Sequence, residues 1–186
     1  RLSMRELALN VLDIAENSLA AGAKNIEILL WADFGEDKMR IDIKDDGCGM
    51  DEETVKKVTD PFTTSRKTRS VGMGLPLFRY SAESTGGRFE IRSEKGKGTE
   101  VFAEYRIGHI DRMPLGDFGG VVLQLITMNP QVDFLVTVEC LDQKGALDTR
   151  EIKEILGEIP LDTPEVRAFL KDYIRENLVS IYGGRL

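Results

Sequence analysis

The chain has 186 residues, with 25 Lys and Arg against 32 Asp and Glu, so its net charge is −7. This balance excludes a generally basic nucleic-acid-binding protein. With 41% hydrophobic and 31% charged residues, the composition is typical of a globular protein rather than a disordered one. The length suits one domain, or one domain with a small appendage.

The longest apolar run, at 28–32, and the apolar-rich segment at 121–125 are far shorter than the roughly 18 residues that a membrane-spanning helix needs. No signal peptide is recognisable, so we expect a cytoplasmic protein that does not bind membranes. Cys48 and Cys140 are too few for a disulfide framework and form no zinc-binding pattern.

Hydrophobic periodicity predicts a mixed α/β arrangement over the first 107 residues. Helices are expected where apolar residues recur at helical spacing between Gly or Pro residues, and strands where apolar and polar residues alternate. In chain order we expect a helix at 3–21, a hairpin of strands at 25–33 and 38–44, a short helix opening at 51–54, a basic surface loop at 60–70, a helix at 74–84, and strands at 88–93 and 100–107. We call the loop at 60–70 the lid.

Closely spaced Gly and Pro residues after Arg106 indicate a domain boundary near residue 110. We therefore expect one domain at 1–110 and a separate small C-terminal α/β unit of unknown role at 111–186. Because 76 residues give only marginal stability, this unit should lean on the first domain or on another chain. Its expected elements are a helix at 118–128, a β-rich run at 132–141, and helices at 149–156 and 163–182.

One polar stripe on the first helix contains Glu6, Asn10, Asp13 and Asn17. Such a stripe usually faces water. However, Asp13 and Asn17 lie one turn apart and combine a carboxylate that can take a proton with an amide oxygen that can bind a hard cation. Spacing alone leaves both interpretations open.

A second motif, Asp45-Asp46-Gly47-Cys48-Gly49, follows a strand rich in Ile. A carboxylate at a strand end can accept a hydrogen bond from an exocyclic amine such as that of adenine, and glycines let a flat ring or a phosphate approach the backbone. The alternative is a Gly-rich turn with solvated aspartates, which an isolated short motif favours by about two to one.

Two further glycine motifs follow. Gly72-Met73-Gly74-Leu75 joins the basic residues 65–69 to a helix start, where free backbone N–H groups and nearby cations would attract a triphosphate. An ordinary surface loop is the alternative. Gly96-Lys97-Gly98-Thr99 is by itself a hairpin turn. The sequence has no GxxxxGK[ST] motif, which excludes a P-loop.

Taken in order, these motifs resemble those of the GHKL ATPases, the group of gyrase, the heat-shock chaperones, histidine kinases and MutL. Residues 13–23 (DIAENSLAAGA) look like the MutL form of the first motif, and residues 60–87 look like a histidine kinase lid. The resemblance covers roughly residues 4–106. It implies the Bergerat fold, a two-layer α/β sandwich that holds ATP between its helices and the lid.

The resemblance also implies roles for single residues and the cofactors ATP and Mg²⁺. Asn17 would be the Mg²⁺ ligand, Asp45 the acceptor for the adenine amine, and Thr99 its water-mediated helper. Asp13 stands where hydrolysing members carry the Glu that acts as general base, and its shorter side chain puts hydrolysis in doubt. The other implied nucleotide-binding residues are Gly47, Gly49, Gly72 and Gly74, with Arg66 or Lys67 near the terminal phosphate.

The function that this resemblance favours is a protein kinase that transfers phosphate to a partner protein in trans, because residues 1–110 contain no helical pair with an acceptor His. The alternatives are a slow regulatory ATPase and a non-catalytic ATP sensor whose lid closure signals to a partner. We expect a protein partner, leave a homodimer open, and expect a chain ending near residue 110 to keep ATP binding but lose partner recognition or oligomerisation.

Overall fold

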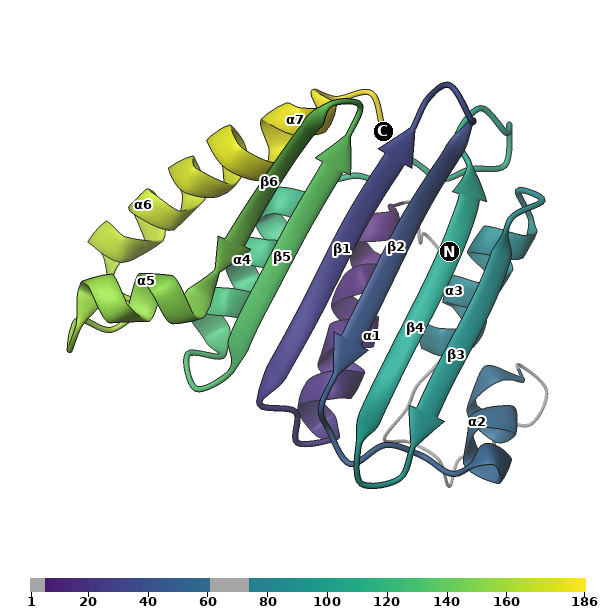
Figure 1. Ribbon diagram of the computed structural model, residues 1–186, viewed down its shortest axis with the longest axis horizontal. Helices are drawn as coiled ribbons and strands as arrows, with labels where there is room; N and C mark the ends of the chain where they lie inside the picture. The colour runs from purple at the N-terminus through teal and green to yellow at the C-terminus, as the bar shows by residue number, and fades with distance from the viewer. Residues whose placement is uncertain (1–5, 61–73) are drawn as a thin grey trace, which may run out of the picture.

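The computed structural model describes residues 6–60 and 74–186, which form a two-layer α/β structure (Figure 1). Its class is the one that the sequence predicts. The elements are α1 (Leu7–Ala20), β1 (Asn25–Asp33), β2 (Lys38–Asp45), α2 (Glu52–Thr59), α3 (Gly74–Glu83), β3 (Arg88–Glu94), β4 (Gly98–Arg106), α4 (Phe118–Met128), β5 (Asp133–Cys140), β6 (Gln143–Asp148), α5 (Thr149–Leu156), α6 (Pro164–Ile174), the π-helix η1 (Arg175–Val179) and α7 (Ser180–Tyr182).

Six strands form one sheet in the order β3-β4-β2-β1-β5-β6. Neighbouring strands are antiparallel except β1 and β5, which run parallel with Asn25 opposite Asp133 and Ala32 opposite Cys140. A parallel partner requires a crossover connection, and the segment that contains α4 supplies it between β4 and β5.

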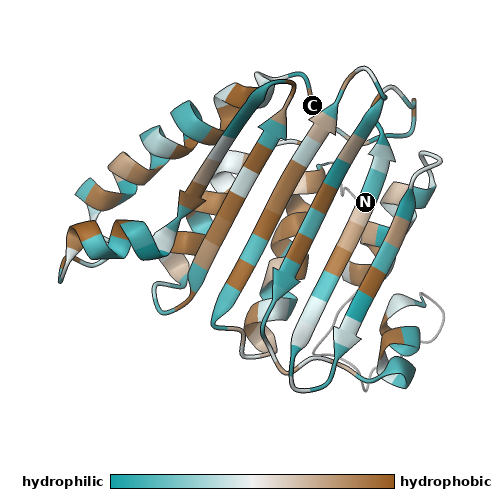
Figure 2. Cartoon of the chain, viewed as in Figure 1, coloured by the Kyte–Doolittle hydropathy of each residue, from teal (hydrophilic) through white to brown (hydrophobic). Residues whose placement is uncertain are grey.

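The strands alternate between a buried face and a more polar face, visible as alternating brown and teal bands in Figure 2. In Figure 1, α1, α3 and α4 lie behind the sheet. In β1, the buried residues Ile26, Ile28 and Leu30 alternate with less buried ones, as expected for a sheet with helices on one face. On the other face, the Arg40 guanidinium lies 4.6 Å from the Trp31 ring centroid.

The expected boundary near residue 110 lies between β4 and α4, yet residues 111–186 extend the same sheet and core. The amide groups of Leu7 and Ala8, which have no partner within α1, donate to the carbonyls of Pro114 and Leu115 at 2.9 and 2.8 Å. Residues 114 and 115 thus cap α1, and β5 and β6 continue the sheet of the first 110 residues. The C-terminal residues pack against the first part of the chain rather than apart from it. That residues 1–110 form a domain of their own stays a prediction.

Two elements differ from the sequence prediction. The strand β6 is not predicted, because Gln143-Lys144-Gly145 has weak strand propensity, and it forms as the antiparallel partner of β5. The helix predicted at 163–182 is present as α6, η1 and α7, with a π-helical segment in its middle. At Gly145, a Cβ atom would overlap the carbonyl oxygen of Asn177, so β6 packs directly on this π-helical backbone.

Candidate functional site

A cavity of about 230 Å³ lies beside α1, the start of α3, the last residue of β2 and the first residues of β4. Four of the predicted site residues line it: Asn17, Asp45, Gly49 and Thr99. The remaining lining residues are mostly apolar or small: Ile14, Ser18, Ala20, Ala21, Cys48, Met50, Thr54, Leu75 and Val101. The cavity therefore combines apolar walls with a few polar groups, as small-molecule sites do.

The polar stripe of α1 does not simply face water. Asn10 is only 1% exposed, with no partner for either amide atom among the described residues, and Asp13 and Asn17 are half-buried. The start of α3 covers this side of the helix, because a Cβ atom on Gly74 would lie 3.2 Å from Asp13 Cβ and 3.8 Å from Asn17 Nδ2. Asp13, Asn17 and Gly74 are thus adjacent.

The Asp45 carboxylate is held at both oxygens. Ser18 Oγ donates to Oδ2 at 2.6 Å, and the Gly47 amide donates to Oδ1 at 2.8 Å. Because two donors face it, the carboxylate is fixed as an acceptor with lone pairs left for a further donor. Ser18 lines the cavity and was not singled out in the sequence analysis, although it follows Asn17 directly and its helical position turns it toward β2.

The strand β4 supplies the other side of this polar group. Thr99 is directly opposite Asp45 in the pairing of β2 with β4. Its hydroxyl lies 2.8 Å from Ser93 Oγ, and Ser93 Oγ also accepts from the Met50 amide at 2.8 Å. Ser93, which the sequence analysis also missed, therefore ties the loop after β2 to the hairpin of β3 and β4.

Glycines bring these loops together by direct backbone contact. Gly49 has φ of +68°, and a Cβ atom there would overlap the carbonyl oxygen of Glu94. Gly98 has φ of +128°, and its Cβ would overlap the carbonyl oxygen of Asp45. Both positions need a conformation and a closeness that side chains oppose, so the two motifs have structural reasons to contain glycine.

The two neighbouring aspartates have different environments. Asp46 Oδ1 accepts from the amides of Lys24 and Asn25, and Oδ2 accepts from Asn25 Nδ2 at 2.8 Å. Asp46 thus fastens the start of β1 to the end of β2. Of the two, Asp45 lines the cavity, and it is the aspartate for which the family resemblance implies a role in adenine binding.

Asp13 and Asn17 differ in how burial affects them. Burial raises the pKa of the Asp13 carboxyl, and the nearby negative charge of Glu16 raises it further. Asn17 Nδ2 is buried with no hydrogen-bond partner in the described part of the chain. A buried amide without a partner is costly, so the Asn17 side chain is suited to a polar group that enters the cavity.

Three predicted residues, Arg66, Lys67 and Gly72, and nearly all of the lid lie outside the described residues. Within residues 6–60 and 74–186, no group of three or more His, Cys, Asp and Glu side chains could hold a metal ion. Over the same residues, no helix is both long enough and apolar enough to cross a membrane.

Comparison with known proteins adds the following. Residues 1–108 match the family model described as histidine kinase-, DNA gyrase B-, and HSP90-like ATPase. Sporulation kinase E of Bacillus subtilis is 33% identical over 96 residues, which make up 52% of this chain and 13% of that kinase. The signal transduction histidine-protein kinase AtoS of Escherichia coli is 33% identical over 95 residues, 51% of this chain and 15% of that protein.

A putative sensor protein of Shewanella frigidimarina is 40% identical over 62 residues, 33% of this chain and 10% of its own length. The chain therefore matches no more than 15% of the length of these three relatives. The family match itself covers more than half of this chain.

Proposed function

We propose that this chain, which belongs to the family of histidine kinase-, DNA gyrase B- and HSP90-like ATPases, binds Mg²⁺-ATP and transfers the terminal phosphoryl group to a partner protein. The observation that carries the nucleotide assignment is the Asp45 carboxylate, held by Ser18 and Gly47 at the edge of a largely apolar cavity.

Adenine fits the chemistry of this cavity. Its amine donates, and the fixed Asp45 carboxylate accepts, while Thr99 beside it offers a hydroxyl for a water-mediated contact. The apolar side chains of Ile14, Leu75 and Val101 suit the faces of a flat ring. Guanine carries a carbonyl oxygen where adenine carries its amine, and that oxygen would face the carboxylate.

The phosphates are assigned to the space beside Asn17 and the first turn of α3. The N–H groups at a helix start have no partners within the helix and favour anions. The Asn17 side-chain oxygen is a suitable Mg²⁺ ligand, and phosphate oxygens and waters would complete the shell, since Mg²⁺ is usually bound by few protein groups beside phosphates. Arg66, Lys67 and Gly72 remain candidate phosphate-binding residues from the sequence.

Asp13 decides between phosphoryl transfer and hydrolysis. Its side chain is one methylene shorter than the Glu of the hydrolysing family pattern, so its carboxylate reaches less far toward an attacking water. Slow water activation favours transfer to a protein acceptor. The relatives named above are described as kinases or a sensor, which supports the same choice.

The adenine assignment is tested by calorimetry of Mg²⁺-ATP and Mg²⁺-GTP binding to the wild type and to Asp45→Asn. The amide would place its NH₂ group against one of the two donors that hold Asp45. The free energy of ATP binding should become less favourable by about 1.5–3 kcal/mol, because a hydrogen bond to a charged group contributes about that much. Equal ATP affinity of the two proteins would remove Asp45 from the adenine site.

The reaction is tested with γ-labelled ATP and a lysate of the source cells. Label on a protein other than this chain supports the kinase, free phosphate supports a slow regulatory ATPase, and neither product supports a non-catalytic ATP sensor. Asn17→Ala serves as the control, because loss of the proposed Mg²⁺ ligand should suppress genuine transfer and leave any contaminating kinase activity unchanged.

A further inference from the structure

The helices α5 and α6 enclose an apolar groove on the C-terminal side of the molecule, with a volume of about 120 Å³. We call it the α5–α6 groove. Its lining residues are Asp148, Glu151, Ile152, Ile155, Leu156, Phe169 and Tyr173. The buried Ile152 forms part of its floor, and the ring of Phe169 lies beside that of Tyr173 with centroids 6.0 Å apart.

Large apolar side chains stand open to solvent at this groove. Ile155 is 85% exposed and Phe169 is 53% exposed, and Ile159, in the connection from α5 to α6 and outside the groove lining, is 55% exposed. A single exposed apolar residue is common on protein surfaces, but several around one groove are typical of an interaction site. The groove therefore offers apolar surface that this chain does not cover with its described residues.

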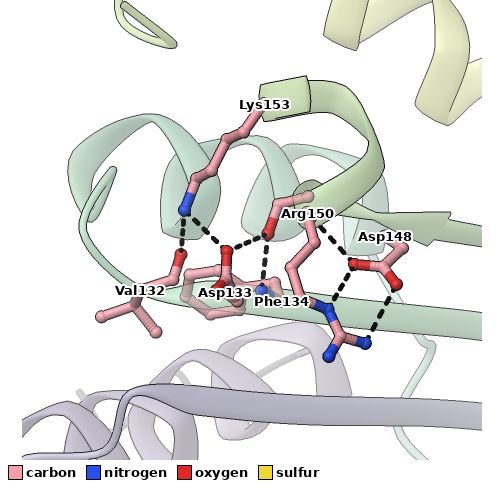
Figure 3. A network of polar contacts seen from close by, with 7 residues as sticks. Val132, Asp133, Phe134, Asp148, Arg150 and Lys153 are labelled. Atoms are coloured by element: carbon pink, nitrogen blue, oxygen red, sulfur yellow. Dashed lines mark hydrogen bonds and ion pairs between the residues drawn. The ribbon is translucent and has the colours of Figure 1, made fainter. Parts of the chain in front are cut away.

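The basic side chains of α5, Arg150 and Lys153, are already paired with neighbouring acidic groups (Figure 3). Arg150 donates to both oxygens of Asp148, at 3.2 Å from Nε and 3.1 Å from Nη2. Lys153 Nζ lies 2.8 Å from Asp133 Oδ1 and 3.1 Å from the Val132 carbonyl. Both cations are thus used to fasten α5 to the strands below it.

Two glutamates without ion pairs to described residues are near the groove: Glu151, which lines it, and Glu165, which precedes the lining residue Phe169 by one turn on α6. Glu151 lies one turn before Ile155, and Glu165 lies one turn before Phe169, so each apolar side chain has a carboxylate beside it on the same helix face. Both glutamates are exposed, and neither forms an ion pair with a described residue. The groove therefore presents apolar surface bordered by unneutralised negative charge.

We propose that the α5–α6 groove binds a basic amphipathic helix of a partner protein. Large apolar side chains of that helix would cover Ile155 and Phe169, and Lys or Arg residues beside them would face Glu151 and Glu165. This is the usual way in which a helix docks in a groove, with apolar anchors at helical spacing and charge complementarity at the rim. The inference does not depend on nucleotide binding, since none of its residues lines the nucleotide cavity.

The test uses the full chain and two labelled synthetic helical peptides with Leu on one face, one carrying Lys and the other Glu at the flanking positions. Fluorescence anisotropy should detect binding of the Lys peptide only, and added salt should weaken it. Phe169→Ser and Ile155→Ser should each weaken binding about tenfold, the effect of removing an apolar anchor from an interface. Met128→Ser, which removes an exposed apolar residue outside the groove, is the matched control.

A second pair of variants leaves the apolar surface intact. Glu151→Lys and Glu165→Lys should weaken the Lys peptide and allow the Glu peptide to bind, and unchanged thermal unfolding shows that the variants remain folded. Equal affinity for both peptides, equal affinity of Met128→Ser and Phe169→Ser, or absence of binding overturns the proposal. So does a wild-type dimer that Phe169→Ser converts to monomer, because the groove would then hold a second copy of this chain.

Discussion

The two halves of the sheet meet their helices in different ways, although both use the same face. Around β2 and β4, small residues such as Ala20 and Ala21 leave a cavity beside α1. Around β5, large side chains of α4 and β5 fill the corresponding layer, with Phe134, Val136 and Leu125 at most 2% exposed. The half around β2 and β4 therefore depends on a cavity that stays open. The half around β5 depends on large side chains that fill its core.

This difference predicts how each half responds to substitution. In the cavity half, adding atoms to the glycine loops should be damaging, because backbone meets backbone there. In the filled half, removing atoms should be damaging, because the remaining structure cannot close around a void.

Removal of residues 111–186 should have the largest effect. It strips β5 from β1 along eight paired positions and takes away the carbonyls of Pro114 and Leu115 that cap α1. We expect the chain of residues 1–110 to unfold at a much lower temperature and denaturant concentration than the full chain. Any fraction that stays folded should still bind ATP, since the described residues that line the cavity all precede residue 110.

Loss of ATP binding in a folded 1–110 chain would mean that the C-terminal residues complete the site. Full stability of that chain would mean that the shared sheet contributes little. Circular dichroism during heating and calorimetry on the same sample distinguish these results.

Phe134→Ala removes a side chain that is 1% exposed from the filled half. The free energy of unfolding should fall by about 3–5 kcal/mol, as for other large-to-small changes in a core, while ATP affinity of the folded protein stays within twofold. Leu135→Ala, on the opposite face of the same strand and only half-buried, is the matched control and should cost less. A similar loss for both variants would contradict the one-sided packing of the sheet.

Gly49→Ala adds one carbon to the cavity half. The new Cβ would meet the Glu94 carbonyl at a positive φ, so we expect a loss of about 1–3 kcal/mol in unfolding free energy and weaker ATP binding. Gly96→Ala is the control, because Gly96 also has positive φ, at +87°, but no atom lies within 4 Å of its added Cβ. If both variants bind ATP equally well, close backbone packing is not what shapes the cavity.

Asp42→Asn should have the smallest effect, and it should raise the free energy of unfolding rather than lower it. Burial, together with the charge and hydrogen bond of Glu100, raises the pKa of Asp42 to about 6. The folded protein then holds a proton that the unfolded chain releases near the ordinary Asp value, so the wild type loses stability as pH rises from about 4 to above 6.

Ionisation of Asp42 lowers the free energy of unfolding, and solvent screening reduces this loss because Asp42 is partly exposed. Asp42→Asn should therefore raise the free energy of unfolding by about 1 kcal/mol at pH 7. The gain should vanish at pH 4, where the wild-type carboxyl is protonated in the folded state. Urea unfolding at both pH values measures it. A gain that does not depend on pH would point to a cause other than the proton.

The sequence predicted the helices and strands that depend on residues close together in the chain. The β1–β2 hairpin, α1, α3 and α4 follow from periodicity and from Gly residues at their ends, and the resemblance of the ordered motifs to those of the GHKL ATPases implied a nucleotide site at Asp13, Asn17 and Asp45. The parallel pairing of β1 with β5 could not be predicted in this way, since it joins segments that are far apart in the sequence. Ser18 was missed because its role depends on β2 lying beside α1.

The cap of α1 has a consequence for how the chain is made. Leu7 leaves the ribosome more than 100 residues before Pro114, the residue whose carbonyl accepts its amide, and β1 emerges equally far ahead of β5. Until then, the first helix frays and an apolar strand has an open edge, which invites pairing with neighbouring chains. We therefore expect stable folding to be slow until the C-terminal residues have been synthesised. Nascent chains that stop before residue 115 should stay bound to chaperones longer than complete chains do.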